Sequence, residues 1–406
     1  MMKITTIYVY PIKALRGISL QSAMIGPQGI MFDRSFMLFQ IQEDGNLRKM
    51  QHSSFPQVAL FSQTFLPAGS GERPNECTAV QVRYHPPPTK SQDDTTVSEE
   101  DNETLDVPLH PDISKLSPVD VDLHKSPTTA YRMGEPYDAW FTSRFGFPVA
   151  LVFIGDGRRP VLGKSLHPPQ PTPNPTPEQK SSWLSTISSY LPGQSSNDPK
   201  ETPWITFTDV APLLITSTSS LHNVSSRLPP STPMPMYKFR PNLVVDGQDE
   251  PAFAEDFWTE LLVTPAPRPH LPPEDRTSFS SSDSAELNDG EKEEEAKKRE
   301  ERKEMMRWRL LLTGNCGRCT SLNVDYDTGK QAEGELGTVL KKLMVDRRVD
   351  RGAKWSPIFG RYAFLGDVGG YWDEIGGVVV QVGDEVEVLE RSGERSVWDW
   401  PGLGST

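Results

Sequence analysis

Residues 3–12 read KITTIYVYPI, an alternation of apolar and polar side chains rich in β-branched and aromatic residues. This pattern predicts a β-strand that is buried on one face. Two later stretches repeat it, RSFMLFQIQ at 34–42 and QVALFSQTFL at 57–66, with the turn signal EDGN at 43–46 between them. We therefore expect the chain to begin with a small β domain.

Strand signals also dominate the second half of the chain. They occur in WITFTDVAPLLITSTSSLHNVSSRL (204–228, a strand and then a short helix), YKFRPNLVVDG (237–247), FAEDFWTELLV (253–263), MRWRLLLTGNC (306–316) and GGVVVQVGDEVEVLER (376–391, with a Gly-Asp hairpin signal). The aromatic spacing of YDAWFTSRFG at 137–146 predicts a helix. The expected fold class is mainly β with some α: two β domains, the N-terminal one β-barrel-like, in each of which a barrel or a curled sheet would remove exposed edges.

Three polar segments interrupt these predicted strands. They are a polar insertion at about 85–125, a Pro/Ser-rich linker at 159–203, and a charged insertion at about 266–304. We therefore predict domains at 1–158 and 204–392. Removing the last insertion places WTELLV against RWRLLLTG, which predicts a hairpin with a long tip.

Composition limits the class of protein. Hydrophobic residues make up 35% of the 406 residues, and 38 are prolines, so we expect part of the chain to be unpacked. The net charge of -13 argues against a general nucleic-acid binder. The three cysteines give no disulfide framework, and the sequence shows neither a targeting segment nor an apolar run near the roughly 18 residues of a membrane span. We expect a soluble intracellular protein, cytoplasmic rather than mitochondrial.

Two cysteines, Cys316 and Cys319, form a CxxC motif with no second pair. A structural zinc site needs four ligands, and none of the seven histidines follows the pair. A redox CxxC normally opens a helix, whereas the residues that follow here predict a short strand and a turn. The residues alone leave the role of the motif open.

Isolated charges lie within strand-like apolar text at Lys13, Arg34, Arg240 and Arg318, and Asn242 follows closely. Each by itself is typical of a surface charge at a strand end. As a set, cations on rigid elements could converge on a phosphate or phosphoester.

The order of six motifs resembles a known family. The motifs are YVYPIKALRG (8–17), FDRSFML (32–38), FRPNLVV (239–245), FAEDFWTELLV (253–263), CGRCTSLNVDYDTG (316–329) and SPIFGRYAFL (356–365). They resemble the molybdenum-cofactor sulfurase C-terminal (MOSC) domain family with its N-terminal β-barrel partner, and in particular the amidoxime-reducing components. The resemblance covers residues 1 to about 60 and 204–392.

The resemblance implies a site. It makes Cys319 the protein ligand of molybdenum and the residue that carries catalysis, and it leaves Cys316 without a metal role. It places Lys13, Arg34, Arg240 and Asn242 around the phosphate of the pterin. Arg318 would stabilise the thiolate or be a solvated loop cation, and Tyr362 would line the cofactor or be a core tyrosine. One departure is TDVAP at 208–212, where the family has hydroxyl side chains, so Val210 and Ala211 could offer only backbone contacts.

The resemblance also implies a function: reduction of small N-hydroxylated substrates by a molybdenum-cofactor-dependent oxidoreductase. A b-type cytochrome and its NADH-dependent reductase would supply the electrons. The alternative is a carrier of molybdenum cofactor or sulfur that turns over no substrate. We do not expect pyridoxal phosphate, because the sequence begins directly with the β domain instead of a lyase domain.

Overall fold

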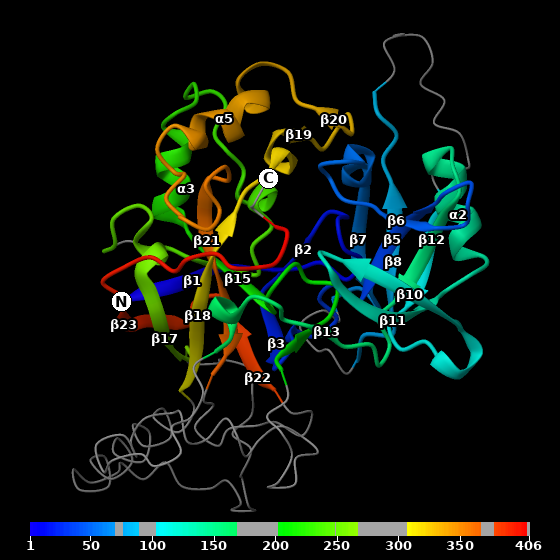
Figure 1. Cartoon of the computed structure of the whole chain (residues 1–406), viewed down its shortest axis with the longest axis horizontal. Helices are drawn as coiled ribbons and strands as arrows, with labels where there is room; N and C mark the ends of the chain where they lie inside the picture. The colour runs from blue at the N-terminus through cyan, green and yellow to red at the C-terminus, as the bar shows by residue number, and fades with distance from the viewer. Residues whose placement is uncertain are drawn as a thin grey trace, which may run out of the picture.

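The computed structural model describes seven stretches of the chain. These are residues 1–69, 76–88, 103–168, 202–247, 249–266, 307–366 and 377–403. The strands form a closed barrel and, beside it, a half-barrel (Figure 1). The predicted fold class, mainly β with some α, is confirmed. Among the described helices, none has both the length and the apolar character needed to cross a membrane.

Seven strands close the barrel in the order β16-β15-β21-β18-β17-β23-β1, because β1 pairs with β16 as well as with β23. Neighbours are antiparallel except for the parallel pair β15 and β16. The short strand β2 (Ile18–Leu20) extends the sheet beyond β1. The barrel strands are β1 (Met2–Val9), β15 (Leu213–Ser217), β16 (Leu243–Val245), β17 (Trp258–Thr264), β18 (Trp308–Gly317), β21 (Ile358–Leu365) and β23 (Glu385–Arg391).

The first strand of the chain belongs to the barrel that the second half builds. Ile4 of β1 pairs with Val245 and Met2 pairs with Val386. The side chains of Met2, Ile4, Ile7 and Val9 are all buried in the main core, because the register of β1 shifts between Ile4 and Thr6 and so brings two alternating runs to the same face. The strand prediction is confirmed, but in space β1 lies in the second barrel and not in a separate N-terminal one. The boundaries at 158 and 204 stay a prediction.

The hairpin predicted across the charged insertion is also present. Strand β17 pairs with β18 in antiparallel register, with Glu260 opposite Leu311 and Leu262 opposite Arg309. The insertion itself falls almost entirely on residues 267–306, outside the described residues.

The half-barrel lies on the right in Figure 1. One of its sheets has the order β10-β11-β12-β5-β6 and another has the order β7-β8-β9. Helix α2 (Tyr137–Phe145) packs on this unit and ends at Gly146 in the left-handed region, as predicted for 137–146. Its strands are β5 (Phe36–Ile41), β6 (Leu47–Lys49), β7 (Phe61–Leu66), β8 (Ala79–Tyr84), β9 (Thr104–Pro108), β10 (Ser117–Leu123), β11 (Ser126–Arg132) and β12 (Val149–Phe153).

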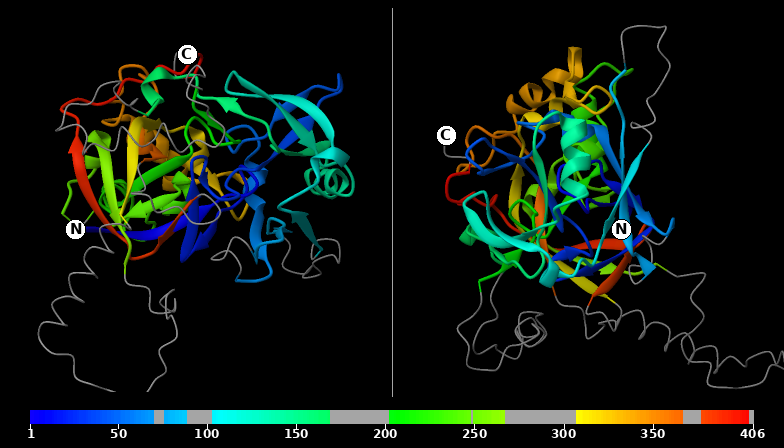
Figure 2. Two further views of the ribbon diagram at one scale, coloured as in Figure 1. Left: turned by 90° about the horizontal axis from the view of Figure 1, so that it is seen from below. Right: turned by 90° about the vertical axis from the view of Figure 1, so that its right-hand side faces the viewer.

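Short elements surround the two units, which Figure 2 shows from two further sides. Strand β22, from the second half of the chain, pairs with β3, from the first half, so one small sheet contains strands from both halves of the sequence. The remaining strands are β3 (Ser22–Gly26), β4 (Gly29–Ile30), β13 (Arg159–Pro160), β14 (Trp204–Ile205), β19 (Val324–Asp325), β20 (Lys330–Gln331) and β22 (Val378–Gln381). The helices are α3 (Thr218–Ser225) and α5 (Val339–Met344), with 3-10 turns η1 (Pro56–Leu60), η4 (Ile113–Lys115), η5 (Lys164–Leu166), η8 (Met236–Phe239), η9 (Ala254–Phe257), η10 (Thr320–Asn323) and η11 (Gly334–Thr338).

Several predicted strands begin later than expected. The first parts of 57–66, 237–247 and 253–263 form the turns η1, η8 and η9, and only the second parts form strands. At η8 the cause is local: Arg240 adopts φ of 53° and Pro241 follows, so a strand cannot run through this point.

The prediction of a polar insertion at about 85–125 is wrong for its second part, which forms paired strands of the half-barrel. Strand β9 pairs with β8, which places Leu105 opposite Val82 and Val107 opposite Val80. Strand β10 pairs with β11 from Ser117 to Leu123. In both strands a few alternating apolar residues lie within a polar stretch of sequence. Pairing with a neighbouring strand stabilises them as β-structure. Residues 89–102 lie outside the described residues.

The predicted linker at 159–203 begins with packed chain. The guanidinium of Arg159 is buried and donates to the carbonyls of Leu123, Thr206 and Thr208 at 2.6 to 2.8 Å. Residues 159–168 are therefore part of the fold, and residues 169–201 lie outside the described residues.

The hairpin predicted at 376–391 does not form. Strand β22 pairs with β3, whereas β23 pairs with β17 and β1. The backbone N–H of Gly383 donates to the carbonyl of Ile4, so the Gly-Asp turn passes the chain from one sheet to the other.

Candidate functional site

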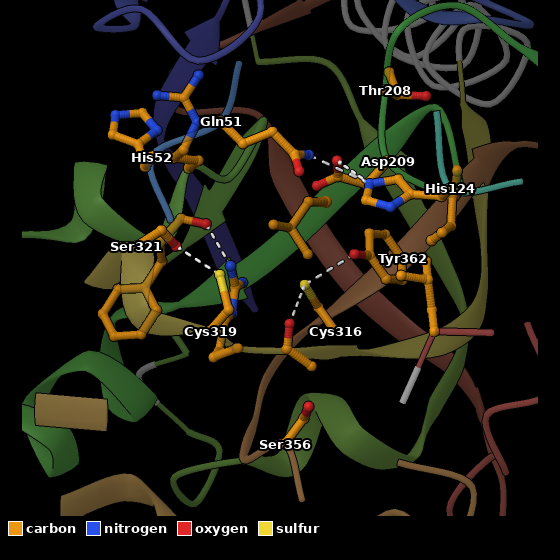
Figure 3. Close-up of a pocket in the computed structure, with 18 of the residues that line it drawn as sticks. Gln51, His52, His124, Thr208, Asp209, Cys316, Cys319, Ser321, Ser356 and Tyr362 are labelled. Carbon is orange, nitrogen blue, oxygen red and sulfur yellow. Dashed lines mark hydrogen bonds and ion pairs between the residues drawn. The ribbon is translucent and has the colours of Figure 1, made fainter. Parts of the chain in front are cut away.

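A cavity of about 340 Å³ lies where the barrel meets the half-barrel. Side chains from distant segments line it, and Figure 3 shows some of them, among them Asp209, His124, Cys316, Cys319 and Tyr362. The seven residues to which the resemblance gives a site role all line this cavity: Lys13, Arg34, Arg240, Asn242, Arg318, Cys319 and Tyr362. The structure brings them together, and their roles stay predictions.

Arg34 and Asn242 are held in a buried network. The Arg34 guanidinium donates to Asp33, to Asn242 Oδ1 (3.0 Å) and to the carbonyl of Arg240 (3.2 Å). The Asn242 amide nitrogen donates to Asp33 Oδ2 (3.1 Å) and to the carbonyl of Tyr8 (3.3 Å), while its oxygen also accepts from a backbone N–H. Because every polar atom of Asn242 is engaged, this side chain supports the wall. Arg34 lies in the turn before β5 with φ of 50°, not inside the strand as expected.

Arg240 is the cation with an unused donor. Its Nη1 donates to the carbonyl of Leu15 at 2.8 Å, while its Nη2 is buried and has no hydrogen-bond partner among the described residues. The guanidiniums of Arg240 and Arg34 lie 4.2 and 4.4 Å from the ring centroid of Tyr10. A buried donor without a partner costs about 1–3 kcal/mol. An anionic ligand in the cavity would satisfy Arg240 Nη2.

Lys13 lies at the same cavity within a chain of polar groups. Its Nζ is 2.5 Å from Asp209 Oδ1, His124 Nε2 lies 3.3 Å from that oxygen, and the Gln51 amide lies 3.4 Å from His124. Burial lowers the pKa of Lys13 to about 8, although Asp209 opposes the shift. Desolvation acts to raise the pKa of Asp209, but Lys13 and His124 outweigh it and hold that pKa well below its ordinary value.

The two cysteines of the motif have different environments. Cys316 is buried near the end of β18, and its Sγ donates to Tyr362 Oη at 3.1 Å. Burial raises the pKa of the Cys316 thiol, and burial likewise raises the pKa of Tyr362 well above its ordinary value. Cys319 follows the strand, is exposed, and donates to Ser321 Oγ at 3.1 Å. Cys316 thus lies in the strand whose signal was found at 306–316.

The guanidinium of Arg318 donates hydrogen bonds to backbone carbonyls. Its Nε and Nη2 donate to the carbonyl of Phe359 (2.9 and 2.7 Å) and its Nη1 to that of Phe239 (2.7 Å). It is therefore not the solvated cation considered from sequence. The structure shows it holding the cysteine loop to the neighbouring turn.

Several lining residues were missed by the sequence reasoning. Asp209 lies in the TDVAP stretch, which we examined only for its missing hydroxyls, and His124 lies in the supposed insertion. His52 and Lys238 are buried in the wall, and burial lowers the pKa of each. The motif YKFR, with two cations around a phenylalanine, was the available signal for Lys238. Among the described residues, no three His, Cys, Asp or Glu side chains form a metal-ligand cluster.

A barrel with a cationic cavity and an exposed thiol at that cavity has the chemistry to hold an anionic ligand. The MOSC N-terminal beta barrel domain model matches residues 1–148, and the MOSC domain model matches residues 202–266 and 288–387. The chain belongs to the family of MOSC-domain proteins with an N-terminal MOSC β-barrel, which connects its function with the molybdenum cofactor. The N-terminal match extends well beyond the 60 residues expected from the motifs.

A relative shares part of this sequence. The chain is 28% identical over 186 residues to human "Mitochondrial amidoxime-reducing component 1". The match covers 46% of this chain and 39% of that protein's length. The name places that relative in mitochondria, so the expectation of a cytoplasmic over a mitochondrial location has no support.

Proposed function

We propose that this chain binds molybdenum cofactor in the cavity and reduces N-hydroxylated small molecules with electrons from a partner protein. The observation that carries the proposal is the pairing, in one cavity, of an exposed thiol at Cys319 with a buried, unpartnered donor at Arg240 Nη2. A pterin phosphate and a soft metal would use both groups. Family membership and the name of the human relative support the same assignment.

The residues fit the cofactor in different ways. Arg240 and Lys13 are the cations that would hold its phosphate, while Arg34 and Asn242 would fix the wall behind them. Cys319 would supply a thiolate ligand, because a thiolate binds soft metals strongly. Val210 and Ala211 line the cavity with apolar side chains, so contacts from this stretch would come from backbone N–H and C=O groups.

When bound, the cofactor supplies two-electron chemistry that removes oxygen from an N–O bond. The chain's own residues would orient the substrate and handle protons. Lys13 Nζ, with a pKa of about 8, carries a proton that is available near neutral pH, and Asp209 Oδ1 accepts its hydrogen bond. His124 Nε2 lies 3.3 Å from the same carboxylate oxygen and would hold Asp209 in position beside Lys13.

We propose a b-type cytochrome and an NADH-dependent reductase as the electron source, on the family resemblance. The name of the relative, a component, supports a reductase that works with other proteins. The alternative, a carrier of cofactor or sulfur, uses the same cavity but turns over no substrate.

The test is the purified protein. Molybdenum content by elemental analysis, followed by reduction of an N-hydroxyamidine with an artificial electron donor, should show bound metal and substrate-dependent oxidation of the donor. Bound molybdenum without turnover would favour the carrier, and absence of both after reconstitution with cofactor would contradict the proposal.

A further inference from the structure

The segment after β23, residues 392–403, reaches the candidate site although it lies beyond both ranges that the family models match. It is the red coil in Figure 1, which leaves β23 and crosses the face of the barrel toward the half-barrel. Trp398 and Leu403 of this segment line the cavity. A part of the site is therefore built from residues outside the ranges that the two family models match.

The segment is anchored on both units. Trp400 Nε1 donates to the carbonyl of His124 (2.7 Å), and the backbone N–H of Trp398 donates to Asp350 Oδ1 (2.9 Å). The Asp399 carboxylate accepts from the backbone N–H and the hydroxyl of Ser165 (3.0 and 2.7 Å). The Trp400 side chain is 1% exposed. These contacts fix the position of the segment, so Trp398 and Leu403 are presented from a rigid support.

Trp398 presents apolar surface to the cavity. Its indole N–H donates to the carbonyl of Leu403 at 2.7 Å, which removes its polar group from the cavity. Its ring lies 6.2 Å from that of Tyr362. Both Trp398 and Leu403 are only partly buried, and they pack against the apolar cluster that contains Val210 and Leu214.

The cavity lining therefore combines two chemically different kinds of side chain. Lys13, Arg34 and Arg240 supply positive charge, whereas Trp398, Leu403 and Tyr362 supply aromatic and aliphatic surface. Partly exposed apolar side chains in a cavity gain free energy when a flat apolar group covers them. A small polar substrate would leave them in water.

We infer that Trp398 and Leu403 form a specificity wall that favours N-hydroxylated substrates with an aromatic substituent over those with a small alkyl group. The inference rests on the proposed function, because it takes the substrate to bind in this cavity. It adds the substrate class and names the residues that select it.

Equilibrium binding tests the wall without turnover. The probes are benzamidoxime, with a phenyl group, and acetamidoxime, with a methyl group, titrated into molybdenum-loaded protein without an electron donor. The wild-type protein should bind benzamidoxime more tightly. Trp398→Ala should weaken benzamidoxime roughly threefold to tenfold and leave acetamidoxime unchanged, since one aromatic contact is lost. Val397→Ala is the control, because Val397 is a neighbouring exposed apolar residue outside the cavity lining.

Leu403→Ala repeats the test if Trp398→Ala does not fold, as judged by its thermal unfolding midpoint. Equal affinity of the wild type for both probes, or an unchanged ratio in folded Trp398→Ala and Leu403→Ala, would overturn the inference. Measuring reduction of both probes separates the two claims. Selective, Trp398-dependent binding without reduction would support the wall and contradict the proposed reductase.

Discussion

The Sγ of Cys316 donates a hydrogen bond to Tyr362 Oη across the pair β18 and β21, at 3.1 Å. This contact separates the two cysteines of one motif: Cys316 is committed to a buried strand-to-strand contact, while Cys319 remains exposed at the cavity. A zinc or dithiol-redox site would use both thiols alike. The observed difference favours a site that uses one.

Arg240→Ala should reduce cofactor retention strongly. The variant removes the guanidinium whose Nη2 is buried without a partner, and loss of a charge-assisted contact to phosphate costs on the order of 2–3 kcal/mol, or roughly a hundredfold in affinity. Lys330→Ala, which removes an exposed charge on β20, is the control. The measurement is molybdenum content after dialysis. Equal content in the two variants would show that Arg240 does not bind the cofactor.

Asn242→Ala should lower the free energy of unfolding by about 2–3 kcal/mol, because Asp33, Arg34 and the carbonyl of Tyr8 lose a buried partner. Denaturant titration of the cofactor-free protein measures this. Gln331→Ala, at an exposed position, should change little. A loss of molybdenum in Asn242→Ala with undiminished stability would instead make Asn242 a direct ligand of the cofactor.

Lys13 should make stability depend on pH in the alkaline range. Its pKa is about 8 in the folded protein and 10.5 ordinarily, so between these values the unfolded chain binds more protons. The free energy of unfolding then rises with pH. Relative to Lys13→Met, the cofactor-free wild type should gain roughly 2 kcal/mol between pH 8 and pH 10. Denaturant titrations of both proteins measure the difference, and a flat or falling difference would contradict the buried environment of Lys13.

The same Lys13 should have the opposite effect on ligand binding. An anion needs the protonated amine, so retention of cofactor should weaken as the pH rises through about 8. Molybdenum content after dialysis at a series of pH values measures this. In Lys13→Arg, whose charge does not titrate in this range, retention should not fall through this window. Identical pH profiles in wild type and Lys13→Arg would assign the effect to another group.

The sequence allowed the cations and Cys319 to be predicted because charges within apolar strand text are unusual, and because six motifs occur in the family's order. It could not show that Asn242 and Arg318 are engaged by protein. The acceptors of Arg318 are carbonyls of Phe239 and Phe359, which only folding brings to it. Asp209 and His124 could be recognised as site residues only from their contacts in the structure, Asp209 with Lys13 and His124 with Asp209.

Most strands of the fold could be predicted from alternation, but their partners could not. Strand β1 closes a barrel with β16, more than 200 residues later, as the contact between Thr5 and Val244 illustrates. The sequence of the turn at Gly383 likewise gives no sign that β22 and β23 belong to different sheets. Trp398 and Leu403 lie outside every motif, so their place in the cavity depends on the anchoring of Trp400.

The most direct test of the account compares Cys319→Ser with Cys316→Ser in molybdenum content and N-hydroxyamidine reduction. Cys319→Ser replaces a soft, strongly donating thiolate by a hydroxyl, so reduction should collapse even if Arg240 and Lys13 retain some cofactor. Cys316→Ser keeps a donor for Tyr362 in a near-isosteric side chain and should retain much of the activity. Matched losses in the two variants, or full activity in Cys319→Ser, would contradict the assignment of Cys319 as the metal ligand.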